Sequence, residues 1–138
     1  MTAGRGIRHS EYNPSASEGV RLLQIWILPE TRGLEPSYET RRFSGTGDGL
    51  RLIASRDGRD GSAVIRQDVS LYAGRLSPGT TLVHPLATGR HAWLQLVAGE
   101  LDLGGTRLRE GDGAAVSDER ELRLASATGG EFLLFDLA

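Results

Sequence analysis

A histidine and a glutamate near the start of the chain could together bind a metal ion. His9 and Glu11 are two residues apart in a stretch, 6–12, whose pattern predicts a β-strand. Because side chains two apart on a strand lie on the same face, the imidazole and the carboxylate would point to one side of a sheet. Such a pair favours Fe(II), Ni, Mn or Zn. Two donors do not make a tight site, so further ligands would have to come from elsewhere.

Each of these residues also has a simpler interpretation. The histidine and the glutamate could form an ordinary hydrogen-bonded pair on a sheet. Gln24 and Trp26 share a face of the next predicted strand, 20–28, and could line the same cavity as the metal. A tryptophan on a strand is more often plain core, so that alternative stays open for Trp26.

The elements that would position these residues are strands. Short apolar runs with alternation, bounded by Gly and Asp, indicate an all-β protein, and no segment keeps a helical period for three turns. The spacing is that of a sandwich or barrel, with tight turns at pairs such as Gly104-Gly105 and a hairpin through Ala98-Gly99. The predicted strands are 6–12, 20–28, 50–55, 62–76, 80–85, 91–97, 100–103, 114–117, 122–125 and 131–137.

A change in amino-acid composition and hydrophobic periodicity divides the chain in two. Residues 29–43 have prolines, many charges and no period, which is typical of a linker or a long crossing loop. The stretch Ser44–Gly49 reads as a flexible turn. We therefore expect a first unit, 1–43, and a second unit, 44–138. Two strands cannot form a core alone, so the first unit must pack on the second, on another copy, or on something absent from this sequence.

Composition excludes several classes of protein. The 138 residues include no cysteine, which rules out a disulfide framework and a thiolate metal site and is compatible with a reducing cytoplasm. The formal charge is -2 and no basic stripe is present, so nucleic acid is not an expected partner. No apolar run approaches the roughly twenty residues of a membrane span, and we expect a soluble, cytoplasmic protein. Phosphate-binding loops and nucleophile elbows are not visible.

Several motifs follow one another along the chain: His9-Ser-Glu11, Gln24-x-Trp26-x-x-Pro29, Glu35-Pro-Ser-Tyr38, Ala92 to Glu100, Gly111-Asp-Gly-Ala114 and Leu133 to Leu137. Their order resembles the pirin family of bicupins along essentially the whole chain. The resemblance implies an all-β cupin fold, the double-stranded β-helix or jelly-roll barrel. Unit 44–138 would be a complete, metal-free second cupin domain, and unit 1–43 would be the last strands of a preceding one.

The same resemblance assigns roles to the first pair. The strand with His9 and Glu11 resembles the one that carries the last two of four metal ligands in that family, and Glu11 would also be catalytic. The other two ligands, both histidines, belong to a half-domain upstream, so the chain is expected to begin partway through the metal-binding domain. The cofactor would be a divalent metal, Fe(II) first and Ni, Mn or Zn as alternatives, only if the missing ligands are supplied, and otherwise none.

The second cupin domain is expected to hold no metal. His84 is one step out of phase with the cupin ligand positions, which places it on the opposite face, and His91 lies at a strand start beside Arg90. Both are interpreted as surface or packing residues. The ligand positions themselves fall on Pro85, Ala87, Ala92 and Val116.

Two functions follow from the resemblance. The first is a metal-dependent dioxygenase of the quercetinase type, acting on a small aromatic, flavonol-like substrate, with a metal site incomplete in this chain. The alternative is a non-catalytic cupin module that acts through protein or small-ligand binding. The apolar face left by the absent half-domain could form a homodimer. A third hypothesis is a remnant that folds without retained chemistry.

Overall fold

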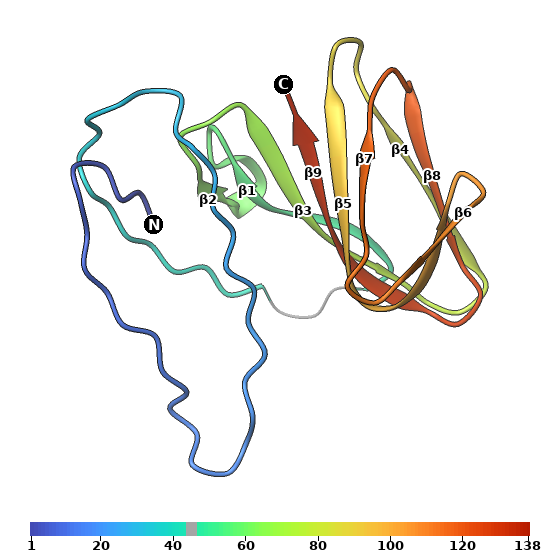
Figure 1. Ribbon diagram of the computed structural model, residues 1–138, viewed down its shortest axis with the longest axis horizontal. Helices are drawn as coiled ribbons and strands as arrows, with labels where there is room; N and C mark the ends of the chain where they lie inside the picture. The colour runs from blue at the N-terminus through green and yellow to red at the C-terminus, as the bar shows by residue number, and fades with distance from the viewer. Residues whose placement is uncertain (44–46) are drawn as a thin grey trace.

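The computed structural model describes residues 1–43 and 47–138, and almost all of its regular structure is β-sheet (Figure 1). The predicted boundary at residue 44 and the start of the Ser44–Gly49 turn lie outside the described residues. No helix in the described ranges is long and apolar enough to cross a membrane. The elements are β1 (Gly49–Ser55), the 3₁₀ turn η1 (Arg59–Gly61), β2 (Ala63–Val64), β3 (Val69–Leu76), β4 (Thr80–Pro85), β5 (His91–Leu103), β6 (Thr106–Arg109), β7 (Gly113–Val116), β8 (Glu121–Ser126) and β9 (Gly130–Leu137).

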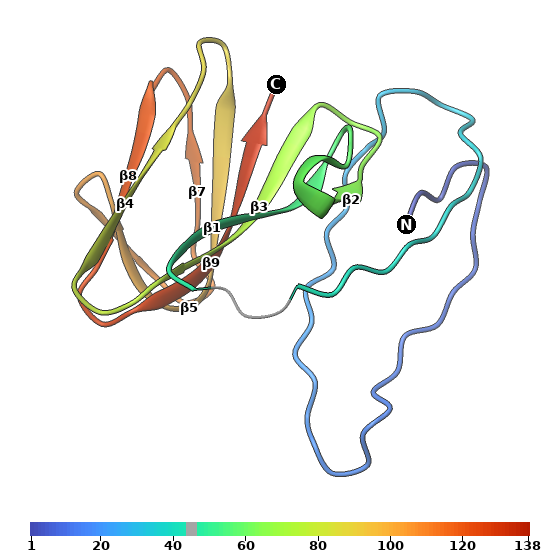
Figure 2. The same cartoon turned by 180° about the vertical axis from the view of Figure 1, so that it is seen from behind.

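The strands form one curled sheet in the order β2-β1-β3-β9-β5-β8-β4, with β6 and β7 also paired to β5. All pairs are antiparallel except β1 with β2. The long strand β5 pairs with β9 and β7 along its first part and with β6 and β8 near its end. Because β5 takes part in both groups, the sheet folds over on itself, as Figures 1 and 2 show from opposite sides. The all-β prediction is confirmed.

The core lies on the concave side of this sheet. Alternate residues of β5, β8 and β9 are buried there, and their neighbours in sequence point outward, as the two-residue period of a strand requires. Leu94, Leu124 and Leu134 are fully buried, and Phe132 is 2% exposed. In β9 the run from Phe132 to Phe135 is apolar throughout, so there the sheet, and not the sequence pattern, decides which side chains are buried.

The hairpin predicted at Ala98-Gly99 is wrong, because β5 continues straight through it. The register between β5 and β9 shifts between Leu96 and Ala98, which is a β-bulge. Gly99 has φ +81°, a single left-handed residue that bends the strand instead of reversing it. The true reversal comes at Gly104-Gly105, as predicted, and leads into β6.

The single long strand predicted over 62–76 is also wrong, since β2 and β3 are separate there. Ile65 still donates its amide hydrogen to the Ser55 carbonyl of β1 at 2.9 Å, but the next two residues bond to the first unit. The Arg66 carbonyl accepts from the Glu30 amide at 2.8 Å, and Gln67 Nε2 donates to the Leu28 carbonyl at 2.9 Å. These bonds interrupt the ladder at the point where the first unit crosses.

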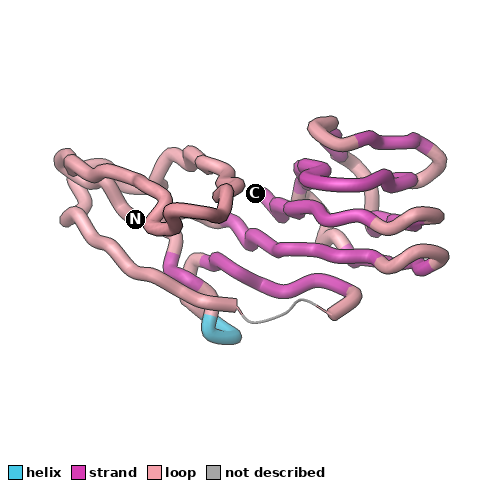
Figure 3. The backbone as a smooth tube through the Cα atoms, turned by 90° about the horizontal axis from the view of Figure 1, so that it is seen from below, coloured by secondary structure: helices cyan, strands magenta, loops and turns pink. Residues whose placement is uncertain are grey.

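The strands predicted over 6–12 and 20–28 are absent, and residues 1–43 run as irregular chain (Figure 3). Their sole ladder-type contact is an isolated bridge between Thr2 and Ser37. Both stretches are extended in outline, but an extended segment becomes a strand only when a neighbour satisfies its amides and carbonyls. Among the described residues no such neighbour lies alongside them.

Candidate functional site

The structure brings together three residues that the sequence singled out. His9 Nε2 lies 3.5 Å from Glu11 Oε1, and both side chains are close to half exposed. Gln24 Nε2 donates a hydrogen bond of 2.9 Å to the other carboxylate oxygen, Glu11 Oε2. The imidazole and the carboxylate thus share a side without the strand that was expected to align them.

The chemistry and spacing of this pair fit a shared metal ion. Two donors bound at about 2.1 Å and separated by a right or tetrahedral angle lie roughly 3.0–3.5 Å apart, which matches the observed contact. The number of donors falls short, since residues 1–43 and 47–138 contain no group of three or more His, Cys, Asp or Glu placed to hold a metal. The pair therefore supplies two donor groups.

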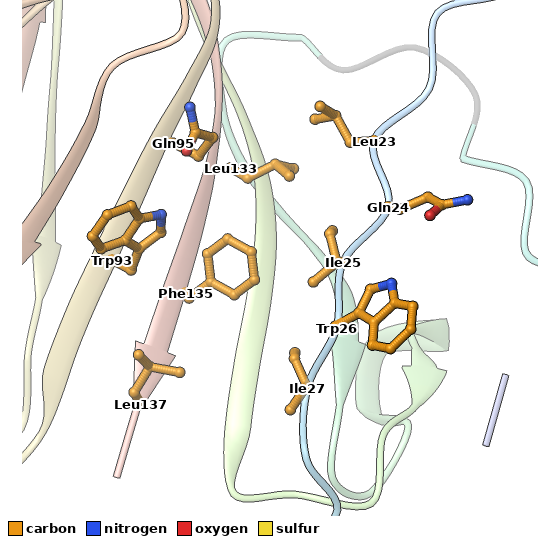
Figure 4. Close-up of a pocket in the computed structure, with 10 residues that line it drawn as sticks. All are labelled: Leu23, Gln24, Ile25, Trp26, Ile27, Trp93, Gln95, Leu133, Phe135 and Leu137. Atoms are coloured by element: carbon orange, nitrogen blue, oxygen red, sulfur yellow. The ribbon is translucent and has the colours of Figure 1, made fainter. Parts of the chain in front are cut away.

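Gln24 belongs to a segment that we call the strap, residues 20–28. The strap is fixed to the second unit near both ends. Arg21 Nη2 donates to Glu110 Oε1 at 2.8 Å, and Gln67 Nε2 donates to the Leu28 carbonyl at 2.9 Å. Between these anchors the strap runs beside the sheet and faces outward side chains of β5 and β9 across a groove (Figure 4).

Side chains alternate along the strap although it has no ladder. In Figure 4 Ile25 points toward the sheet, whereas Gln24 and Trp26 point away from it. Trp26 is 92% exposed, so its interpretation as plain core is wrong. A groove of about 470 Å³ lies under the strap, lined by Leu23, Gln24, Ile25, Trp26, Ile27, Trp93, Gln95, Leu133, Phe135 and Leu137.

His84 lies on the half-buried side of β4, on the opposite face from Pro85, as its phase predicted. It shares the half-buried side of that strand with Leu82, and its ring packs edge-on against Tyr72 with centroids 5.2 Å apart. Its Nε2 is buried, has no hydrogen-bond partner in the described residues and lies 3.9 Å from Asp136 Oδ2. It is a packing residue, whereas His91 is exposed and contacts Ser117 Oγ at 2.9 Å.

The ion cluster beside this histidine was not predicted from the sequence. Arg90 bonds both Asp136, through Nε, and Asp68 Oδ1, through Nη1 at 2.9 Å. Asp136 lies on the same side of β9 as the buried Phe132 and Leu134. A charge at a core-facing position was the available signal, because such a charge needs a partner.

Acid is expected to destabilise the fold through His84. Burial lowers the pKa of its imidazole below the ordinary 6.5, and Asp136 opposes this in part. Below pH 6.5 the unfolded chain binds a proton that the folded chain does not yet bind. The free energy of unfolding should therefore keep its highest value above pH 6.5. Below pH 6.5 it should fall by at most about 1.4 kcal/mol per pH unit, until the pH passes the lowered pKa of the folded state.

Urea unfolding between about pH 5 and 7.5 would measure this slope. The variant His84→Leu should lose it, and an equal slope in both proteins would contradict the assignment. Asp57 does not interfere, because hydrogen bonds from the Arg59 backbone and side chain lower its pKa from 3.8, so it titrates at more acidic pH.

Comparison with family models matches both units. Residues 52–137 match the model described as "Quercetinase C-terminal cupin domain", and residues 1–27 match the model described as "Pirin". A crystal structure of YhhW from Escherichia coli superposes with a TM-score of 0.79 at 39% identity, covering 82% of this chain and 48% of that one. A second structure, of the bacterial pirin YhhW from Escherichia coli in complex with nickel(II), superposes with a TM-score of 0.77. The superposition covers 81% of this chain and 48% of that one. The cupin fold prediction is confirmed.

Curated proteins with similar sequences carry names from the same family as these models and structures. A protein named quercetin 2,3-dioxygenase from Escherichia coli K12 is 44% identical over 137 residues, which is 99% of this chain and 59% of the relative. A pirin-like protein from Caulobacter vibrioides is 36% identical over 141 residues, 100% of this chain and 60% of the relative. The chain thus spans about three-fifths of the length of these relatives.

Proposed function

Because this chain belongs to the pirin family of cupins, we propose that it contributes His9 and Glu11 to the divalent-metal site of a quercetinase-type dioxygenase. The observation that carries the proposal is the 3.5 Å approach of the His9 imidazole to the Glu11 carboxylate. Further ligands must come from outside the residues described here. The unit 44–138 is proposed to be a metal-free cupin domain that supports the first unit.

Each residue has a definite task in this proposal. A bound Fe(II) or Ni(II) would supply a Lewis acid with open positions for substrate. His9 would offer its Nε2 as one ligand, and Glu11 would offer a carboxylate oxygen beside it. The carboxylate can also accept the proton that a phenolic substrate hydroxyl loses on binding. The names of the relatives support a small flavonol as the substrate class, and a cytoplasmic location and the absence of nucleic-acid binding stay predictions.

Nickel binding tests the proposal. In the ¹⁵N-labelled chain, Ni(II) should broaden the amide signals around residues 9–11 first. Since His9 is one of two donors, His9→Ala should weaken binding by at least about tenfold. The matched control is His91→Ala, which removes another exposed imidazole and should leave the titration unchanged. Equal binding by wild type and His9→Ala would refute the metal site.

A second function has support in the exposed apolar surface of the first unit. Tyr12, Trp26 and Leu28 are each more than 80% exposed, which is costly unless a partner covers them. This favours the alternative of a non-catalytic binding module, with a homodimer as one form of it. A folded chain that takes up no Ni(II) would support this alternative over the enzyme.

A further inference from the structure

The two oxygens of Glu11 have different partners, and this difference points to a role for Gln24. Oε1 faces His9 Nε2 at 3.5 Å, and Oε2 accepts the amide hydrogen of Gln24 at 2.9 Å. The first distance is too long for a hydrogen bond, and the second is a good one. One oxygen is therefore held by the protein while the other is left beside the imidazole.

We infer that Gln24 is a positioning residue for the proposed metal site, an inference that rests on the proposed function. By holding Oε2, the amide stops the carboxylate from rotating about its last torsion and presents Oε1 alone to the ion shared with His9. The carboxylate would then bind through one oxygen, which leaves more of the coordination sphere open for substrate. Hydrogen bonds of this kind to ligating carboxylates commonly change metal affinity by about 10- to 100-fold.

The place of Gln24 is set by the second unit. Arg21 and Leu28, near the two ends of the strap, bond to Glu110 and Gln67 of the second unit. Ile25 faces the sheet, and Gln24 points away from it (Figure 4). The carboxamide is thus carried by a segment fixed to the cupin domain 44–138, which gives that domain a part in the metal site without supplying a ligand.

The test removes the donor and keeps the side-chain length. Gln24→Met should weaken Ni(II) binding by about 10- to 100-fold in the full chain. The visible absorption of bound Co(II) should also change, because the carboxylate would bind in another geometry, and a merely structural role would leave that spectrum unaltered. Gln24→Asn keeps an amide donor on a shorter side chain and should recover part of the affinity.

The control is Gln95→Met, since the Gln95 amide donates only to backbone carbonyls, at 3.0 Å to Gly111 and 3.1 Å to Asp112 among the stronger contacts. It should leave affinity and spectrum unchanged. If His9→Ala abolishes binding while Gln24→Met binds with wild-type affinity and spectrum, the positioning role is overturned and the metal site stands. If wild type binds no better than His9→Ala, both fail. Circular dichroism of each variant verifies the fold.

Discussion

Phe132→Ala is expected to lower the free energy of unfolding by about 3–5 kcal/mol. Phe132 is 2% exposed on the inner side of β9, and its cross-strand neighbour on β3 is Gly74. A Cβ on Gly74 would lie 2.3 Å from the phenyl ring, so the ring occupies the space that a side chain there would need. Removing the ring leaves a cavity that the opposite strand cannot fill.

Urea denaturation followed by circular dichroism measures this loss. The matched control is Leu133→Ala, one residue along β9 on the outer face, where the side chain is half-buried. It should cost about 1 kcal/mol, because the site is open to solvent and can relax. Comparable losses at the two positions would mean that the concave side is not the dominant core.

Gly99→Ala is expected to cost at least about 2–3 kcal/mol, from two sources that add. The φ of +81° is left-handed, and an alanine there is strained by roughly 1–2 kcal/mol. A Cβ at this position would also lie 2.2 Å from the carbonyl oxygen of Gly129. That atom is backbone in the neighbouring chain segment, so it cannot move aside as the end of a flexible side chain would.

Gly89→Ala separates the strain of the left-handed backbone from the steric clash of the added Cβ. Gly89 has a nearly identical φ of +78°, and nothing lies within 4 Å of its Cβ position. It should show the strain alone, about 1–2 kcal/mol. Thermal unfolding of both variants gives the comparison, and equal losses would show that the close approach at the β5 bulge is unimportant.

The candidate site was predictable only in part. His9 and Glu11 share a side because residues two apart in any extended backbone do so, whether or not a ladder forms. The same local geometry places Gln24 and Trp26 together. The Gln24 bond to Glu11 was not predictable, since it joins segments thirteen residues apart that no local pattern relates.

The errors have a common origin. Apolar alternation marks 6–12 and 20–28 as extended, but ladder partners decide whether they become strands. A left-handed Gly99 decides between a bend and a reversal in β5.

What local chemistry dictates was readable from the residues alone: the all-β class, the turn at Gly104-Gly105, and the donor types at His9 and Glu11. Hydrophobic periodicity and turn propensity depend on residues close together in the chain, so they can be recognised in the amino-acid sequence. Packing decided the rest, including the strap beside β5 and β9, the Arg90–Asp136 cluster and the approach of Gln24 to Glu11. These contacts join residues far apart in the chain, and their energies arise only when the sheet brings them together.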